Sequence, residues 1–306
     1  MGDTSILIKD RELRLKAALL SYQKTERNLE EYITVITNWF KTQKHLPEIP
    51  EKNIIINFLL MNKFVIQSTK EKLEMYYSIR TIIPEFFQGK HPCSDRMQKS
   101  TDKIYFIPLP KVTERGYRVV IIKCLESPEN FNVCDFFAHT YNVSEIRLNE
   151  DVAVGDILVY DFDNLKVGHF LKLTPVIIKK STIVLEKVYS NRVKQIHILN
   201  TPKYASTTIS IAKKVMKPKM ASRIHIHKKF ASVFKYIPMD ILPKDYGGNE
   251  KTLEELNQLW KAKLAEYKER FDALEKIRIK EELKPMPLIN DEILGFHGNF
   301  RKLDLD

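Results

Sequence analysis

Three histidines in the second half of the chain have the spacing of a possible metal site. His225 and His227 lie two residues apart in a predicted strand, so their side chains point to the same face and could act as a pair of metal ligands. His197, in an earlier predicted strand, could provide a third ligand. No cysteine or carboxylate cluster lies near them in the sequence. We therefore interpret them as structural histidines and predict no bound metal.

Two aspartates and three cysteines are the other residues with catalytic potential. Asp161 and Asp163 follow a predicted buried strand, where a role in a turn or a helix cap is the better interpretation than a catalytic pair. Cys93, Cys124 and Cys134 lack metal or redox spacing, and an odd number fits a reducing compartment. The sequence has no glycine-rich phosphate loop and no G-x-S-x-G elbow. We expect a protein that is not an enzyme and that uses no cofactor.

Basic charge is concentrated in one region of the chain. Between Lys166 and Lys235 there are fourteen lysines and two arginines against one acid, Glu186, which gives a net charge of +15. The whole chain carries +11, so the remainder sums to −4. A local patch of this kind predicts an anionic partner. Its lysines alternate with Ile, Val and Met rather than with aromatic residues, which favours anionic lipid over nucleic acid.

The segment 201–217 inside this region predicts an amphipathic helix. Thr201 is placed to cap its N-terminus, and Pro202 suits the first helical position. One predicted face carries Tyr204, Ala205, Thr208, Ile209, Ile211, Ala212, Val215 and Met216, and the other carries Lys203, Ser206, Thr207, Ser210, Lys213, Lys214 and Lys217. Such a helix could cover an apolar cavity, lie on an anionic membrane or form an ordinary surface.

The remaining periodicity predicts an α/β protein with a helical N-terminal part. Helical patterns occupy 13–20, 29–40, 54–64 and 69–82, and a polar linker follows near 89–102. Predicted strands at 117–125, 156–162, 195–199 and 224–226 then alternate with helical segments near 134–142, 175–189 and 202–217, which indicates a largely parallel sheet. Apolar residues between Lys251 and Leu283 recur at helical spacing. They predict a long helix packed on the domain, with a self-associating coiled coil as the alternative.

The sequence lacks secretion and membrane-spanning signals, which predicts a cytoplasmic protein. The sequence has no run of about 18 or more apolar residues, as a membrane-spanning helix requires, and its N-terminus lacks the apolar region of a signal peptide. Met1-Gly2 resembles a myristoylation start, but position 6 is Ile where Ser or Thr is needed. We expect an intracellular protein that associates with membranes peripherally.

Several ordered runs resemble the CRAL-TRIO lipid-binding family. The run I-P-M-D-I-L-P-K-D-Y-G-G at 237–248 is similar to the signature that closes the family's lipid-binding domain. R-I-H-I-H, V-K-Q-I-H-I-L-N-T-P, G-D-I-L-V-Y-D-F-D and P-L-P-K-V-T-E-R-G-Y-R-V-V resemble other blocks, and W-F-K-T-Q-K-H-L-P and G-F-H-G-N-F-R-K-L-D-L-D resemble its insect α-tocopherol transfer protein-like branch. Departures include Asn164 in place of a glycine, Tyr189-Ser190 in place of Tyr-Pro, and Lys213-Lys214 in place of Lys-Pro.

The resemblance implies a helical N-terminal domain over 1–88, a lipid-binding domain over 103–248 and a C-terminal helix and tail over 249–306. It also implies an apolar cavity floored by a mostly parallel sheet and closed by a helical lid. The matching pocket positions are Tyr160, Leu173, Val184, Leu185, Tyr189, Ile196, Ile209 and Ile211, and those of the lid are Tyr204, Ile209, Ile211, Val215 and Met216. Gly168 and Ser181 replace larger apolar groups of the tocopherol-binding relatives, so the cavity could be reshaped and the ligand identity stays open.

The resemblance further implies phosphoinositide binding by Arg192, Lys194, Lys219 and Arg223. A further arginine of the family's N-terminal motif is missing, since Leu60 and Asn62 stand there. The implied function is intracellular transfer of a hydrophobic small molecule, such as a tocopherol, a retinoid or a related isoprenoid, at phosphoinositide-containing membranes. The alternative is a phosphoinositide-binding membrane adaptor without a transferred ligand.

Overall fold

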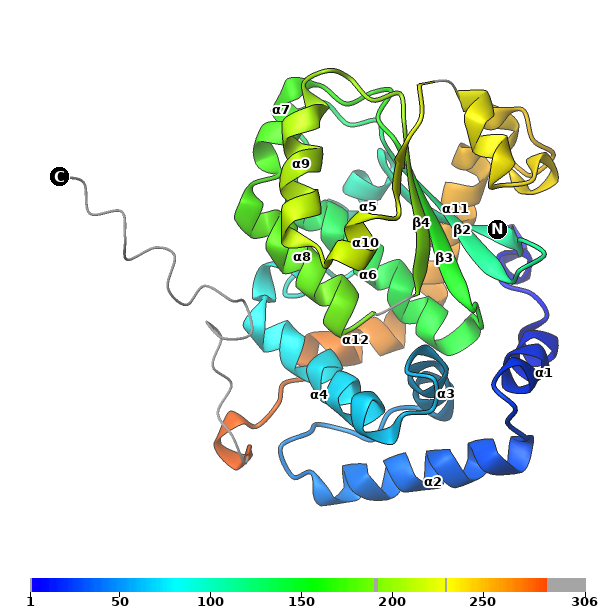
Figure 1. The fold of residues 1–306 in the computed structure, drawn as a ribbon. Helices are drawn as coiled ribbons and strands as arrows, with labels where there is room; N and C mark the ends of the chain where they lie inside the picture. The colour runs from blue at the N-terminus through cyan, green and yellow to red at the C-terminus, as the bar shows by residue number, and fades with distance from the viewer. Residues whose placement is uncertain (1, 190–191, 229, 285–306) are drawn as a thin grey trace.

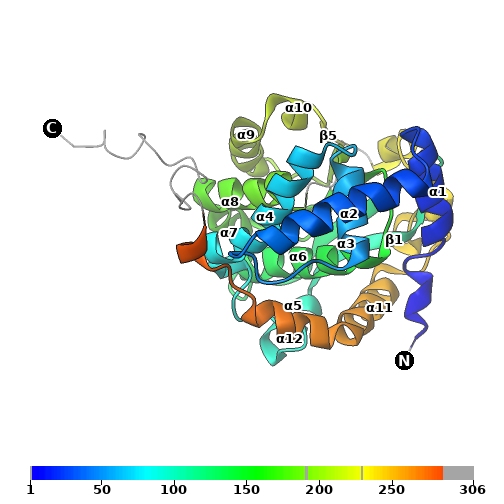
Figure 2. The same cartoon turned by 90° about the horizontal axis from the view of Figure 1, so that it is seen from below.

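The computed structural model describes residues 2–189, 192–228 and 230–284 (Figure 1). Its first part is helical, as predicted, and consists of η1 (Thr4–Ile6), α1 (Arg11–Ser21), α2 (Glu26–Thr42), α3 (Lys52–Met61) and α4 (Ile66–Ile82). Thr25 begins α2 with a capping box, because its hydroxyl accepts a hydrogen bond from Asn28 N while the Asn28 side chain accepts one from Thr25 N. Helices α2 to α4 lie together at the lower end of the molecule (Figures 1 and 2).

A five-stranded sheet forms the centre of the second part. Its strands are adjacent in the order β1 (Ile104–Val112), β2 (Tyr117–Cys124), β3 (Gly155–Asp161), β4 (Val193–Leu199) and β5 (Ile224–Ile226). β1 is antiparallel to β2 and the other pairs are parallel, which confirms the predicted, largely parallel sheet. β1 was not predicted, because Pro108 and Pro110 interrupt its sequence pattern. An edge strand tolerates such prolines.

Helices cover both faces of this sheet. η2 (Pro84–Phe86), α5 (Asp95–Thr101) and α6 (Val133–Glu150) precede β3, and α7 (Val167–Lys172) and α8 (Pro175–Lys187) follow it. α9 (Ala205–Val215) and α10 (Pro218–Ala221) lie with α7 and α8 on one side of the sheet (Figure 1). The short helices η3 (Phe230–Lys235), η4 (Met239–Ile241) and η5 (Lys244–Tyr246) lie on the other side. Within the described residues, none of the helices has both the length and the apolarity to span a bilayer.

The start of α9 differs from the prediction. The helix begins at Ala205, whose N–H donates to the Pro202 carbonyl, and Tyr204 occupies the capping position without a side-chain cap. Thr201 Oγ1 is buried without a hydrogen-bond partner among the described residues. The four residues from Thr201 therefore complete the turn after β4, where Asn200 has a positive φ of 51°.

The C-terminal helical region is divided into α11 (Leu253–Glu266) and α12 (Lys268–Lys276), with η6 (Glu281–Leu283) after them. Its prediction as one long helix was wrong, because the helix breaks at Tyr267, whose hydroxyl donates to Glu150 Oε1 at 2.7 Å. Trp260 is fully buried and donates through Nε1 to the Pro108 carbonyl at 3.1 Å. This packing on β1 already buries the apolar face that a coiled coil would need. The predicted C-terminal tail lies in 285–306, outside the described residues.

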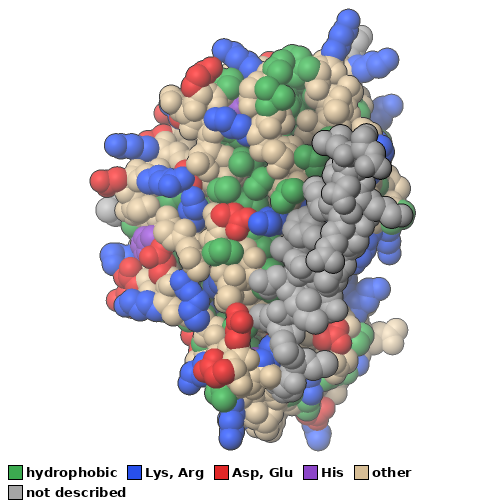
Figure 3. All heavy atoms as spheres, turned by 90° about the vertical axis from the view of Figure 1, so that its left-hand side faces the viewer, with side chains coloured by type: hydrophobic (Ala, Val, Ile, Leu, Met, Phe, Trp, Pro, Cys, Tyr) green, Lys and Arg blue, Asp and Glu red, His purple; other side chains and the backbone are tan. Residues whose placement is uncertain are grey.

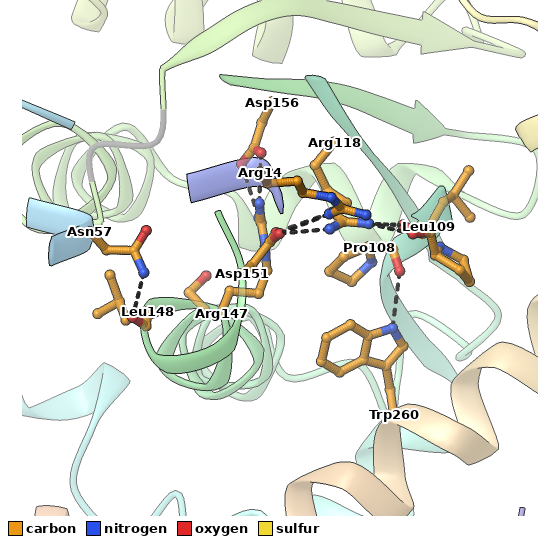
Figure 4. Close-up of polar contacts among 12 residues, drawn as sticks. Arg14, Asn57, Pro108, Leu109, Arg118, Arg147, Leu148, Asp151, Asp156 and Trp260 are labelled. Atoms are coloured by element: carbon orange, nitrogen blue, oxygen red, sulfur yellow. Dashed lines mark hydrogen bonds and ion pairs between the residues drawn. The ribbon is translucent and has the colours of Figure 1, made fainter. Parts of the chain in front are cut away.

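A buried ion network joins α1 and α6 to the sheet (Figure 4). Asp151 accepts hydrogen bonds from Arg118 at 2.6 and 3.1 Å and from Arg147 at 3.0 Å, while Arg14 approaches it at 3.5 Å. Arg147 also donates to both oxygens of Asp156 at 2.7 and 2.9 Å. Although burial acts against it, the pKa of Asp151 lies well below its ordinary value because these arginines stabilise the carboxylate. The network links α1, α6, β2 and β3.

His139 on α6 gives a testable pH dependence. Its side chain is fully buried, neither ring nitrogen has a partner among the described residues, and burial lowers its pKa to about 4. The unfolded chain, with a histidine pKa of about 6.5, therefore binds this proton first as the pH falls, and stability drops by roughly 3 kcal/mol between pH 6.5 and 4. We expect His139→Leu to remove this share of the pH dependence in urea unfolding. If the free energy of unfolding fell equally with decreasing pH in the parent and the variant, this role of His139 would be contradicted.

Candidate functional site

An apolar cavity of ≈ 190 Å³ lies between the sheet and α6 to α9. The sheet contributes Ile122, Leu158, Ile196, Ile198 and Ile224, which belong to four adjacent strands. Alternate residues of a strand point to one face, so these isoleucines and leucine share the side that α8 and α9 cover. The helices, the segment before α6 and the loop after β3 add Phe131, Phe136, Phe137, Phe162, Leu165, Phe170, Ile178, Thr208, Ala212 and Met216. The cavity can therefore hold a hydrophobic molecule.

Five of the predicted pocket residues line this cavity: Tyr160, Leu173, Leu185, Ile196 and Ile209. Val184 and Tyr189 lie instead in a separate apolar cluster, where the N-terminal helices pack against α6 and α8. α8 has two buried faces. Ser181 and Leu185 lie on the face toward the cavity, and Val184 lies on the face toward the N-terminal helices. The Tyr189 ring stacks on Tyr141 with centroids 5.4 Å apart. Ile211 is partly buried on α9 and is not in the cavity lining.

α9 covers the cavity with Thr208, Ile209, Ala212 and Met216. Of the other predicted lid residues, Val215 is partly buried, and Tyr204 is 43% exposed. The Tyr204 hydroxyl donates to the Leu165 carbonyl at 2.7 Å, and its ring contacts Phe170 with centroids 5.6 Å apart. These two contacts fasten the N-terminal end of α9 to α7 and the loop before it.

The sequence prediction missed the phenylalanines of the lining. Phe131, Phe136 and Phe137 come from the start of α6 and the residues before it, and Phe162 and Phe170 come from the segment after β3. A high density of phenylalanine around position 135 is the signal that could have found the first group. The Phe162 and Phe170 rings pack edge to face with centroids 5.4 Å apart.

Charged groups at one end of the cavity are paired with one another. Asp161 accepts hydrogen bonds from Lys123 Nζ, Asn200 Nδ2 and the Tyr246 hydroxyl, each at 2.8 Å. These bonds outweigh burial and lower the pKa of Asp161, so the carboxylate stays ionised. Asp161 also accepts from Asp163 N at 3.1 Å, which is the turn role predicted from the sequence. Tyr246 belongs to the run at 237–248, so this hydrogen bond ties that run to the carboxyl end of β3.

The four predicted phosphoinositide-binding residues lie near one another. Burial lowers the pKa of Lys194, and the positive charges of Arg192, Arg223, Lys63 and Lys219 lower it further. Lys63 and Lys219 are exposed, and Arg223 donates to the Val193 carbonyl. Lys63, which the sequence prediction missed, directly follows Asn62 in the motif whose arginine is absent. It brings a positive charge from the N-terminal helices to this patch.

Arg192 is held by the end of α3. It donates to the Leu60 carbonyl at 3.2 Å and to the Met61 carbonyl at 3.4 Å, and it contacts the Tyr22 hydroxyl. Its guanidinium also lies over the Tyr22 ring, 5.2 Å from the centroid. A cation beside the last carbonyls of a helix is favoured by the helix dipole. Arg192 therefore joins α3 to β4 and has fewer donors free for a phosphate than an exposed arginine has.

The three histidines lie on the opposite face of the sheet from the cavity. His197 Nδ1 and His227 Nε2 form a hydrogen bond at 2.7 Å, and His197 Nε2 lies 3.2 Å from Gln195 Oε1. The Tyr236 ring packs on His197 and His225 with centroids 4.7 and 5.2 Å apart. Burial lowers the pKa of His197 to about 3, so it is neutral at physiological pH. These contacts support the interpretation of the histidines as packing groups.

A family model described as "CRAL/TRIO domain" matches residues 102–248. Residues 102–248 therefore form a CRAL/TRIO domain. A second model, described as "Pinta-like, UBA domain", matches residues 25–97, which include α2 to α4 of the structure. The match agrees with the resemblance found in the sequence and with the mostly parallel sheet, the cavity and the helical cover. CRAL/TRIO proteins bind lipids and other hydrophobic small molecules and are generally not enzymes.

The chain is also similar to individual relatives and to a solved structure. It is 27% identical over 245 residues to proteins named "Alpha-tocopherol transfer protein-like" from Mus musculus and from Homo sapiens. Each alignment covers 79% of this chain and 68% of the relative. The solved structure titled "Crystal structure of Sfh5" superposes with a TM-score of 0.49 and 11% identity, over 76% of this chain and 90% of that chain.

Proposed function

We propose that this protein transfers a hydrophobic small molecule, such as a tocopherol, a retinoid or a related isoprenoid, between phosphoinositide-containing membranes. The observation that carries the proposal is the cavity under α9, whose lining is apolar apart from a few groups and whose charges are paired with one another. Burying an unpaired charge against a lipid would be costly, and this cavity avoids it. In this proposal 1–88 and 103–248 act as the helical and lipid-binding domains of a cytoplasmic protein, with 249–306 as a C-terminal extension.

The size of the cavity supports a moving lid. Its ≈ 190 Å³ lies below the roughly 300–1,000 Å³ typical of pockets for drug-sized ligands, so a tocopherol or a retinoid requires α9 to move outward. An outward movement exposes Ile209, Ala212 and Met216, which a membrane surface accepts better than water does.

The surface around the lid suits contact with an anionic membrane. Val167, Leu171, Val176 and Tyr204 on the α7 to α9 side are between 38% and 74% exposed. Figure 3 shows hydrophobic side chains on the face to the left of Figure 1, interspersed with Lys and Arg and with some Asp and Glu. Apolar groups beside cations are the pattern of proteins that bind a membrane interface.

A reversible tether tests the lid. Two cysteines introduced at facing positions of α8 and α9 should form a disulfide that keeps the cavity closed. We expect the oxidised protein to lose transfer of a fluorescent tocopherol analogue between vesicles, and reduction to restore it. Equal transfer rates in the two forms, with the bond confirmed by mass spectrometry, would show that α9 is not a lid.

Neutralising exposed lysines tests the basic patch formed by Lys63, Arg192, Lys194, Lys219 and Arg223. Because each basic group near an anionic surface contributes about 1 kcal/mol, Lys63→Ala combined with Lys219→Ala should weaken binding to phosphoinositide vesicles roughly tenfold or more and flatten its salt dependence. Lys16→Ala combined with Lys41→Ala removes the same charge from exposed positions on α1 and α2 and serves as the control. Equal losses in the two double variants would show that only net charge matters.

A further inference from the structure

Three histidines form one contiguous cluster on the face of the sheet opposite the cavity. His197 is fully buried, and its Nδ1 lies 2.7 Å from Nε2 of His227, which is 7% exposed. His227 Nδ1 lies 2.5 Å from the Ser232 hydroxyl, and His197 Nε2 lies 3.2 Å from Gln195 Oε1. His225 stacks on His197 with ring centroids 5.2 Å apart. This histidine cluster therefore places three titratable rings in contact with one another.

The hydrogen bonds of the histidine cluster require neutral rings. Because the Gln195 oxygen can only accept, His197 carries its proton on Nε2 and accepts through Nδ1 from the Nε2–H of His227. His227 in turn accepts through Nδ1 from the Ser232 hydroxyl. A second proton on His197 would lie on Nδ1 and face the N–H of His227, so two donors would meet with no acceptor between them. Protonation of His197 therefore breaks the bond that joins β4 to the residue after β5.

The described surroundings offer no negative charge to balance a protonated ring. Burial, together with the charges of His227 and His225, lowers the pKa of His197 to about 3, and burial and His225 lower that of His227. The register partner of His197 on β3 is the buried Val159, and the Tyr236 ring packs on all three imidazoles. The described charged side chains between β5 and the end of η3 are exposed cations, Lys228 and Lys235.

β5 is the element that the histidine cluster holds against the sheet. It pairs with β4 through three residue pairs, and the amides of Ile196 and His227 donate to the carbonyls of Arg223 and Ile198, each at 2.9 Å. β5 also follows directly after α9 and α10, so it fastens the C-terminal end of the lid to the sheet (Figure 2). Separation of β5 from β4 would therefore release that end of α9.

We propose that the histidine cluster is an acid-sensitive switch, whose protonation at mildly acidic pH releases β5 from β4 and allows α9 to open. In the released state the rings meet water and take up protons near pH 6.5, whereas the closed state excludes these protons. The closed state is therefore fully stable above pH 6.5 and loses stability as the pH falls. His197 alone shifts the equilibrium toward release about tenfold between pH 7.5 and 5.5. The switch rests on the proposed function, because it supplies a condition under which the lid opens.

Amide hydrogen exchange of the full chain, followed by NMR, tests the switch directly. Protection of the Ile196 and His227 amides, corrected for the intrinsic pH dependence of exchange, should fall about tenfold or more from pH 7.5 to 5.5. The amides between β2 and β3 should keep their protection. His197→Gln cannot take up the proton, so its fall should be roughly threefold or less. His225→Gln serves if that variant does not fold, and His139→Leu, which removes a buried histidine outside the cluster, is the control and should behave like the parent.

Lipid release gives a second readout. A fluorescent tocopherol analogue should leave the parent faster at pH 5.5 than at pH 7.5, toward uncharged phosphatidylcholine vesicles that do not engage the basic patch. His197→Gln should lose most of this acceleration.

The outcomes separate the switch from the proposed function. If protection of the Ile196 and His227 amides does not change with pH, or falls equally in His197→Gln, the switch is wrong and the transfer function stands. If protection falls as expected but release is not faster at pH 5.5, the coupling of β5 to the lid is wrong. If the chain binds no tocopherol analogue at either pH, the proposed function fails, and hydrogen exchange still decides whether β5 responds to acid.

Discussion

Ile196→Asp is expected to abolish lipid binding. Ile196 on β4 is 5% exposed and lines the cavity, with Ile198 and Ile224 beside it. A carboxylate there would face the ligand directly, and Lys123 of the described lining is already paired with Asp161. This costs several kcal/mol and should weaken binding by roughly a hundredfold or more. Titration with retinol or α-tocopherol, followed by ligand fluorescence, measures the loss.

A conservative variant and a second site control this experiment. Ile196→Val removes one methylene and should cost only about 1 kcal/mol in stability. Vesicle binding through Lys63 and Lys219 should persist in the folded Ile196→Asp protein, because the patch does not depend on the cavity. Unchanged ligand affinity in that folded variant would mean that the lipid binds elsewhere.

Asp151→Asn is expected to destabilise the fold by about 3–5 kcal/mol, because it breaks a buried ion network by removing one partner. Arg118 is fully buried and Arg147 is 6% exposed, so neither can turn to water when the carboxylate charge is lost. Urea unfolding at neutral pH measures the change as a lower midpoint.

An exposed ion pair provides the matched control. The Arg27 and Glu31 side chains are 90% and 58% exposed and lie 3.2 Å apart, and Glu31→Gln should change stability by less than about 1 kcal/mol. Similar losses for Asp151→Asn and Glu31→Gln would contradict the proposed role of the buried network.

The strands and the N-terminal helices were largely predictable because their patterns are local. The run I-L-V-Y-D-F is apolar on both faces and forms β3, and the apolar spacing of 29–40 forms the inner face of α2. The start of α9 was not predictable, because Thr201 and Pro202 have the composition of a helix start but lie in the turn after β4. Tertiary packing overrides such local signals.

The cavity was predictable only where one face of an element is buried. On β4 the alternation places Ile196 toward the cavity without ambiguity. On α8 the cavity face and the face toward α4 are both apolar, so the sequence could not assign Val184 to one of them. Arg192 shows a second limit, since its partners Leu60 and Met61 belong to α3 and no local pattern reveals that contact.

The most direct test of the central claim is to extract the protein, purified from its native source, into organic solvent and to identify any bound lipid by mass spectrometry. A transfer protein with this cavity should release one hydrophobic small molecule per chain. A folded protein that releases no lipid, yet still binds phosphoinositide vesicles, would contradict transfer and identify the chain as a membrane adaptor.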